Sequence, residues 1–260
     1  MKENLLLFLL FLLFLLFLLF LLFLLFLHST QVFCSEEKIK KTAIIDIDRP
    51  IVKGISHNYF EYFNVPPEGV ILNNKEAQAD TIINEITGDQ ISFLNGNIHV
   101  IGKMAHVIIA NPNGIECYQC SASDVTGFTL ISGYTKNQGS DFFLSNRNYV
   151  YINDVRIFSR VAKNINIISN EVYLEGGIYG NVNDLNITSG LVTYNPQLEN
   201  KVNSYGRISF FDGFDAYLNK INIKHGYGEI YFDKEAYRII ERKLNINSLF
   251  GNRAVYISYY

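Results

Sequence analysis

The chain has 260 residues, of which 48% are hydrophobic, and its formal net charge at pH 7 is −3. So mild a charge argues against a nucleic-acid partner, which would need a basic stripe. The length is ample for one buried core once an N-terminal targeting segment has been set aside.

The N-terminus has the composition of a secretory signal. Lys2 and the free amino group outweigh Glu3, and Leu5 to Leu27 is an unbroken run of 23 Leu and Phe residues. Signal cores usually have about 7–15 apolar residues, whereas about 20 residues span a bilayer. The run therefore fits a long cleavable signal or an anchor at residues 5–27. The polar stretch that follows it favours cleavage.

Two cleavage positions are compatible with this signal, one after Ser29 and one after Cys34. Lipid attachment at Cys34 is a third option, which bulky Phe33 disfavours because a lipoprotein signal needs a small residue there. We therefore expect a signal peptide at residues 1–34 and one secreted domain at residues 35–260, which passes through the periplasm.

The rest of the chain consists mainly of short alternating runs of strand-forming residues separated by turn residues, a pattern that predicts an all-β domain. His57 lies in one such run. No Ser or Cys in a nucleophile motif accompanies it, so we interpret His57 as a buried or edge histidine rather than a catalytic one.

A tight turn is predicted where Asn111-Pro112-Asn113-Gly114 follows the apolar run 106–110 and precedes Ile115. Pro112 presets φ at the second turn position, Asn113 accepts a left-handed conformation, and Gly114 adds further freedom. By itself, strand–turn–strand is a common structural motif.

Cys117 and Cys120 form a C-x-x-C pair. Such a pair suggests a disulfide, a redox couple or half of a zinc site. Zinc would need two more ligands, and the five histidines show no ligand spacing; a thioredoxin-like couple would need a βαβ pattern. Because the signal implies an oxidising compartment, we expect a small structural disulfide.

A weak internal repeat suggests the architecture. The run Asn164–Ile167 recurs as 184–187, 220–223 and 243–246, at steps of 20, 36 and 23 residues. Steps of 20–25 residues suit one coil of a solenoid, and the longer step suits a coil with an insertion near 196–204. Stacked copies bury apolar faces that one strand cannot bury alone, which favours a parallel β-helix. An antiparallel sandwich is the alternative.

Two remaining segments have local interpretations. Asp212 and Asp215 flank a Gly-Phe pair, and we interpret them as a solvated turn rather than a catalytic carboxylate pair. Lys234–Lys243 is the one helix-like stretch, expected as a short helix or a loop. No nucleotide-binding loop or calcium-binding array is visible, so we expect no catalytic residues, no metal and no cofactor.

Two blocks of sequence carry a family resemblance: Gly54–Phe60 running on to Val70–Asn74, and Val107–Ile115 followed by Cys117–Cys120. Together they resemble the N-terminal secretion domain of two-partner secretion exoproteins, the filamentous haemagglutinin and haemolysin family. One departure is that residues 75–83 lack the second Asn-Pro-Asn-Leu motif usual in the family. That departure would be expected to weaken recognition by a transporter.

The resemblance implies a right-handed parallel β-helix, or solenoid, with an N-terminal β cap, which we expect from about Ile55 to Ile246. It also implies that Asn111, Pro112, Asn113, Gly114 and Ile115 form a secretion motif whose alteration impairs export. Many family members carry a cysteine pair at the place of Cys117 and Cys120.

The function implied is that of a non-catalytic, secreted, adhesin-type exoprotein. Its expected partner is an outer-membrane transporter with periplasmic receptor domains, and host-cell surface glycans or receptors are further candidates. Since the sequence ends at Tyr260, we expect a secretion domain with little or no cargo. The alternatives are a haemolysin or contact-dependent toxin fragment, and an extracellular polysaccharide-acting β-helix enzyme.

Overall fold

The computed structural model describes residues 2–31, 42–50, 54–136, 141–144, 148–195, 198, 200–248 and 255–258, with side chains of the first segment described at 8–22 only. The chain divides into two compact units, Met1–Lys41 and Thr42–Tyr260. Cys34, at one expected cleavage position, and Pro196, in the expected insertion, lie outside the described residues.

The first unit contains helix α1 (Lys2–Gln31). Leu is a strong helix former, and the run contains no Gly or Pro to interrupt it. The Leu and Phe side chains described in it are exposed. Among the described residues, no helix is both long and apolar enough to cross a membrane. Cleavage of residues 1–34, and the alternative of an anchor at 5–27, stay predictions.

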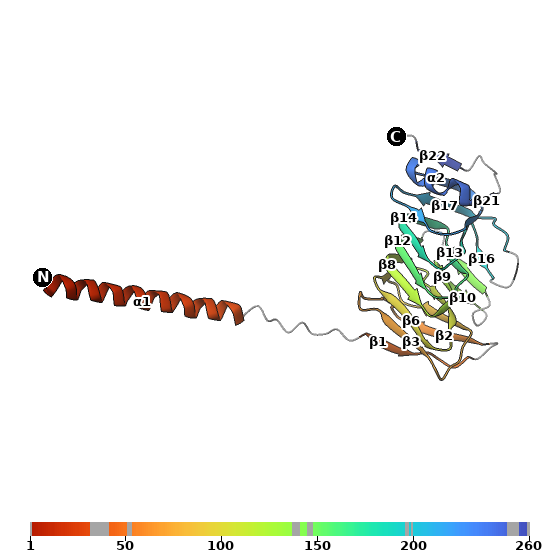
Figure 1. Cartoon of the computed structure of the whole chain (residues 1–260). Coiled ribbons are helices and arrows are strands. Elements are labelled where there is room, and N and C mark those ends of the chain that lie inside the picture. Colours follow the sequence, from red (N-terminus) through yellow and green to blue (C-terminus); the bar gives the residue numbers. More distant parts are fainter. Residues whose placement is uncertain are drawn as a thin grey trace. The chain divides into compact units, whose positions relative to one another are not determined.

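The second unit is a parallel β-helix, so the predicted fold class is confirmed (Figure 1). Its sheet A contains β1 (Ala43–Asp46), β3 (Val70–Asn74), β5 (Ser92–Leu94), β6 (Asn97–Gly102), β8 (Ile115–Ser123), β12 (Tyr149–Phe158), β14 (Glu171–Gly180), β17 (Tyr205–Phe210), β18 (Asp215–Ala216), β20 (Tyr227–Phe232) and β22 (Val255–Ile257). Its sheet B contains β2 (Ile55–Phe60), β4 (Thr81–Ile86), β7 (Ala105–Ala110), β9 (Val125–Ile131), β13 (Asn164–Ile168), β15 (Asp184–Ser189), β19 (Lys220–His225) and β21 (Leu244–Ser248).

On the coils that contain β8, β12 and β14, the sheet A part bends in the middle, so that these coils have three segments. β8 and β12 run through the bend as continuous strands. On the preceding coil, β5 pairs with the first half of β8 and β6 pairs with its second half. On the coil after β14, β17 pairs with the first half of β14 and β18 pairs with its second half. The first halves of β8, β12 and β14 therefore form one face of the molecule, and their second halves form another.

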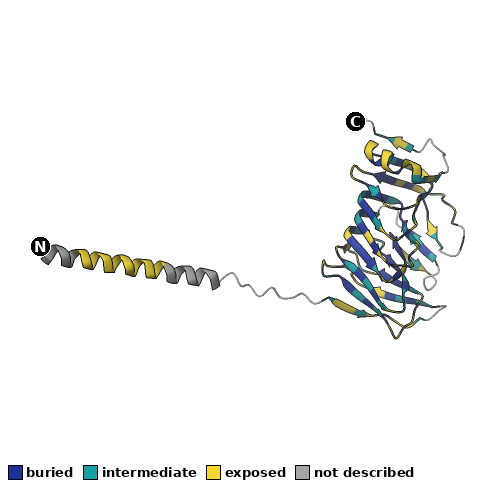
Figure 2. Cartoon of the chain, viewed as in Figure 1, coloured by how far each residue is buried: buried dark blue, intermediate teal, exposed yellow. Residues whose placement is uncertain are grey.

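The repeated Ile/Leu-Asn-Ile runs lie in register on successive coils. Ile165 pairs with Leu185, Leu185 pairs with Ile221, and all three side chains are fully buried. The predicted interior column is therefore confirmed, and Leu244 continues it. Inward-facing residues of sheets A and B form one continuous core, visible as buried stretches along the stacked strands (Figure 2).

An asparagine ladder, formed by Asn166, Asn186, Asn222 and Asn245, runs along the outer face of sheet B. Each side-chain amide donates to the Oδ1 of the asparagine one coil earlier, at 2.9, 2.9 and 3.1 Å. Asn166 itself donates to Thr129 Oγ1 at 2.9 Å. Alternation along a strand explains the placement: the residue between two buried apolar neighbours points outward.

A small antiparallel sheet C covers part of sheet B. It consists of β10 (Gly133–Lys136), β11 (Asp141–Leu144) and β16 (Thr193–Tyr194). Phe142 and Leu144 pack against outward-facing Ile83, Ile108 and Ile168 in a second apolar cluster. β16 belongs to the segment that makes the 36-residue step longer than one coil, so the predicted insertion is present.

Separate elements close the two ends of the core. At the N-terminal end, β1 pairs in parallel with β3, and buried Ile47 and Phe63 join the core. Near the C-terminal end, α2 (Lys234–Ile240) buries Ala236 and Ile240, and η1 (Glu241–Lys243) follows it. The Asp233 carboxylate caps α2 by accepting from the Glu235 N–H at 2.8 Å. The stretch expected as a helix or a loop is thus helical.

Candidate functional site

The predicted secretion motif forms the turn between β7 and β8. Asn111 is fully buried, and its amide donates to the Gln90 carbonyl and to Ser92 Oγ, each at 2.9 Å. Its backbone N–H donates to the Ile131 carbonyl of the next coil at 3.0 Å. Asn111 therefore joins three consecutive coils at one corner.

The remaining residues of the motif complete a β-turn. The Gly114 N–H donates to the Asn111 carbonyl at 3.3 Å, and the Asn113 N–H donates to Asn111 Oδ1 at 2.8 Å. The Asn113 amide donates to the Gly88 carbonyl at 2.7 Å. Ile115 is fully buried and begins β8.

Asn113 does not use the left-handed conformation that its residue type accepts. The residue with positive φ in this turn is Gly114, at 121°. Asn at the first position, Pro at the second and Gly at the fourth suit a type I turn, whose third position has negative φ. The bond from the Asn113 N–H to Asn111 Oδ1 holds this geometry.

The motif therefore acts within the fold as a clamp. Asn111, Gly114 and Ile115 are buried, whereas Pro112 and Asn113 are half-buried. Of the motif, only Pro112 and Asn113 present surface that a partner could contact directly. The clamp's other half consists of Gly88, Gln90 and Ser92, which no sequence motif indicated.

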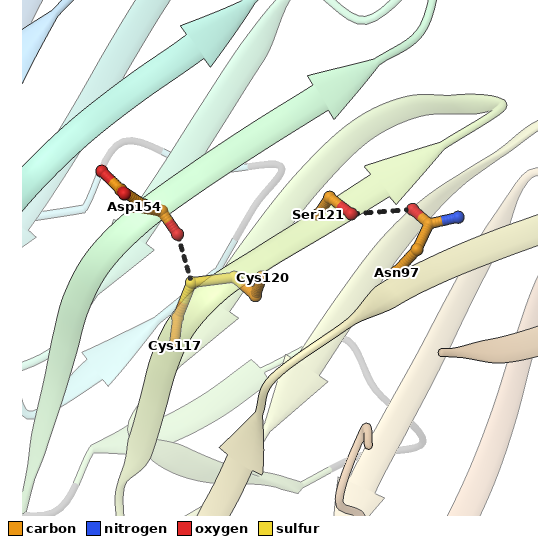
Figure 3. The surroundings of a disulfide bond; sticks show 5 residues. All are labelled: Asn97, Cys117, Cys120, Ser121 and Asp154. Carbon is orange, nitrogen blue, oxygen red and sulfur yellow. Dashed lines mark hydrogen bonds between the residues drawn. A yellow bond between two sulfur atoms is a disulfide. The ribbon is translucent and has the colours of Figure 1, made fainter. Parts of the chain in front are cut away.

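Cys117 and Cys120 are joined by a disulfide within β8, with their Cα atoms 5.3 Å apart, and both are fully buried (Figure 3). Between them, Gln119 has a φ of 55°, in the left-handed region. Residues other than Gly rarely take this conformation unless the surrounding structure enforces it. The disulfide encloses the strained residue and fixes the bend of β8.

The same bend recurs on the next two coils without a disulfide. Asp154 in β12 has a φ of 61°, and Gly176 in β14 has a φ of 67°. Asp154 faces the Cys pair, since Cys117 Sγ lies 3.5 Å from its carbonyl oxygen (Figure 3). The disulfide thus lies at the first of three stacked left-handed bends.

His57 lies on the edge strand β2, one of the two placements predicted, and its side chain is only 8% exposed. Its Nε2 lies 2.7 Å from Glu85 Oε2. Thr135 of sheet C donates its backbone N–H to Glu85 Oε1 at 3.0 Å and its hydroxyl to Glu85 Oε2. Burial raises the pKa of Glu85, but the hydrogen bonds from His57 and Thr135 outweigh it and lower the pKa.

This cluster ties sheet C to sheet B. The Thr135 hydroxyl donates to Glu85 Oε2 and also lies 3.4 Å from His57 Nε2, and that same nitrogen lies 2.7 Å from Glu85 Oε2. Nucleophilic activation would need Nε2 to accept from the hydroxyl, whereas here the shorter contacts of both groups are to the carboxylate. Glu85 and Thr135 had no signal in the sequence, because their partners lie 28 and 50 residues apart in the chain.

Asp212 and Asp215 belong to a turn. Gly213 has a φ of 85°, the Phe214 N–H donates to the Phe211 carbonyl at 3.2 Å, and the Phe214 side chain is fully buried. Asp215 accepts from the Ala216 N–H at 2.6 Å. Across the described part of the chain, no group of three or more His, Cys, Asp or Glu could hold a metal ion.

Carboxylates do gather on the face formed by the first halves of β8, β12 and β14. Glu116 accepts from Tyr149 and Glu175 accepts from Tyr151. Glu171 accepts from Tyr173 at 2.7 Å. Each carboxylate is thus bonded by its own tyrosine. A hydrolytic pair would instead need two carboxylates aimed at one point between them.

Comparison with known proteins places most of the chain in one family. Residues 28–234 match the family model described as the TPS secretion domain. A toxin CdiA of Yersinia pestis is 31% identical over 170 residues, which cover 57% of this chain and 5% of that protein. A hemolysin of Serratia marcescens is 33% identical over 109 residues, covering 35% of this chain and 7% of that protein.

A solved structure shares the fold. The filamentous hemagglutinin secretion domain matches with a TM-score of 0.63 and 22% sequence identity, over 75% of this chain and 84% of that one. At that identity the likeness concerns the fold. The chain spans only a few per cent of the length of the curated relatives cited above.

Proposed function

The chain belongs to the TPS secretion domain family of two-partner secretion exoproteins, and from that premise we propose that its β-helix is a non-catalytic export signal for an outer-membrane transporter. The observation that carries the proposal is the family match over residues 28–234, which includes the Asn111–Ile115 turn. Domains of this family direct secretion to the cell surface through a TpsB-type transporter.

Recognition is proposed to occur through strand pairing before the fold is complete. β1 and β2 are the first strands of sheets A and B, and each has a hydrogen-bonded neighbour on one side. An incompletely folded chain offers many more unpaired N–H and C=O groups than the finished solenoid does. Periplasmic receptor domains could pair with these groups as an added strand.

Folding outside the cell would then make export directional. Each coil pairs in parallel with the coil before it, and the asparagine ladder links coil to coil in the same order. A coil that has formed on the outside cannot pass back without losing its core contacts. The buried Asn111 clamp joins early coils, so it would support the first stable unit.

The exported protein is proposed to be an adhesin-type exoprotein displayed at the cell surface, with host-cell surface glycans or receptors as ligands. The alternative is a haemolysin or contact-dependent toxin fragment, which the printed names of the relatives support. For the motif we propose residues Asn111, Pro112, Asn113, Gly114 and Ile115, with the Cys117–Cys120 disulfide beside it.

The test is secretion of variants from cells that carry the cognate transporter. Asn111→Ala and Asn113→Ala should leave synthesis and signal processing intact while the secreted fraction falls. Asn181→Ala is the matched control, since Asn181 is exposed and outside the motif. Normal secretion of both motif variants would remove the basis for assigning the motif, and an equal loss in Asn181→Ala would show that the effect is not specific.

A further inference from the structure

A row of aromatic rings crosses successive coils on the outer face formed by the first halves of β8, β12 and β14. Tyr118 and Tyr151 have ring centroids 5.2 Å apart, Tyr149 and Tyr173 5.8 Å, and Tyr173 and Phe211 6.2 Å. Tyr118 and Phe211 are 41% and 38% exposed. We refer to these five residues as the tyrosine face. Exposed apolar patches of this kind mark ligand-binding or interaction surfaces.

Hydrogen bonds hold the rings of the tyrosine face in place. The phenol groups of Tyr149, Tyr151 and Tyr173 donate to Glu116, Glu175 and Glu171 in turn. A rigid tyrosine loses little conformational entropy when a ligand covers it, which is why tyrosine is common at binding surfaces. The rings are therefore already ordered for contact.

The tyrosine face is also negatively charged. The hydrogen bond to Glu116, together with burial, raises the pKa of Tyr149 to about 12. Burial and the hydrogen bond to Glu171 raise the pKa of Tyr173 to about 12. Ionisation of a phenol is unfavourable there because carboxylates lie close by. Anionic polymers such as sulfated glycans would meet the same repulsion.

Groups that donate and groups that accept hydrogen bonds lie beside the rings. The three glutamates accept, whereas the Asn153 amide, which donates to the Tyr151 hydroxyl at 3.3 Å, and the Arg207 guanidinium, 4.0 Å from Glu229, can donate. Flat apolar surface with a few placed polar groups is the general pattern of a binding site. A pyranose ring has the matching chemistry, with a C–H face that packs on an aromatic ring and hydroxyls at its rim.

We propose that the tyrosine face binds a neutral saccharide chain laid across the coils. The open face suits an extended polymer that touches rings on several coils, and its charge excludes anionic glycans. A basic peptide is the competing occupant, but its ammonium and guanidinium groups lack the flat C–H face with which a pyranose packs on the rings. The proposal rests on the proposed function only in taking the domain to be displayed outside the cell.

The test is binding of the exported protein to immobilised neutral oligosaccharides of at least six sugars, drawn from β-glucan, xylan and poly-N-acetyllactosamine. A heparin hexasaccharide and an oligolysine peptide are included as charged probes. Tyr118→Ala and Tyr173→Ala should each weaken neutral-saccharide binding at least tenfold, whereas Tyr118→Phe should stay within about threefold. Tyr62→Ala is the control, because Tyr62 is 67% exposed and outside the tyrosine face.

Loss of neutral-saccharide binding in the two alanine variants, with Tyr62→Ala unchanged and unaltered melting of all variants, would support the proposal. Binding to heparin or oligolysine alone, no saccharide binding, or equal effects of Tyr62→Ala and Tyr118→Ala would overturn it. Cleavage of the oligosaccharide would overturn a purely binding role. Transporter-dependent secretion of the same variants, measured in parallel, should be normal, so a failure of export and a failure of saccharide binding are separate results.

Discussion

Replacing Asn111 by alanine should be the most damaging single change in the proposed secretion motif. The substitution removes two hydrogen bonds donated by the buried amide and the acceptor that orients the Asn113 N–H. The two donated bonds contribute about 1 kcal/mol each, and leaving the buried Ser92 hydroxyl without this partner costs about 1–3 kcal/mol more. The expected loss of unfolding free energy is therefore about 3–5 kcal/mol, a large part of the 5–15 kcal/mol typical of a domain.

Urea denaturation of the purified protein, followed by far-UV circular dichroism, measures this loss. Asn113→Ala is the internal comparison. Asn113 is half-buried, so water can replace part of its bonding, and its loss should be about 1–2 kcal/mol. A loss below about 1 kcal/mol for Asn111→Ala, or a larger loss for Asn113→Ala than for Asn111→Ala, would refute the clamp. Secretion that falls in Asn113→Ala without a matching loss of stability would mean that a partner reads the turn directly.

Three further predictions concern the rest of the domain. Thiol labelling of the native secreted protein should give no signal at Cys117 and Cys120, and stoichiometric labelling would contradict the disulfide. Replacing both cysteines by serine should lower the free energy of unfolding by less than the ~3 kcal/mol expected for a 15-residue loop, because the loop that this disulfide closes is short. Burial lowers the pKa of His106 to about 4 from 6.5. Between these pH values the unfolded chain binds a proton that the folded chain does not bind, so the free energy of unfolding should fall by at most about 3 kcal/mol as the pH drops from 6.5 to about 4. Urea midpoints across this range should show a shallower fall for His106→Gln, and identical slopes would count against the assignment. Asn186→Ala removes two hydrogen bonds of the asparagine ladder and should lower the free energy of unfolding by about 1–2 kcal/mol, whereas Asn245→Ala, at the exposed end of the ladder, should lower it by about half as much. Equal losses in urea titrations would argue against a ladder.

The β-helix was predictable because one-residue alternation decides which side chains face the core. Ile165, Leu185 and Ile221 occupy the same place in runs of the same pattern. When these runs align in parallel, all three side chains point to the same side of the sheet and are buried together. The insertion was predictable from its length alone. Its pairing with β11 was not, because Phe142 and Tyr194 meet only through tertiary packing across the intervening coils.

The motif turn lies where the sequence placed it, but its residue types left open which residue takes positive φ. Turn propensity allows both Asn and Gly to do so, and the bond from the Asn113 N–H to Asn111 Oδ1 accompanies the geometry in which Gly114 does. The stacked left-handed bends had no sequence signal, because Gln119, Asp154 and Gly176 are three different residue types. The tyrosine face was missed because its rings come from strands that only the coil register brings together.

The central claim is that this domain is exported because a partner transporter recognises it. The most direct measurement is the fraction of the wild-type chain outside the cell, in matched strains with and without a cognate TpsB-type transporter. We expect secretion in the first strain and retention of the processed chain in the periplasm in the second. Equal secretion from both strains would contradict the account.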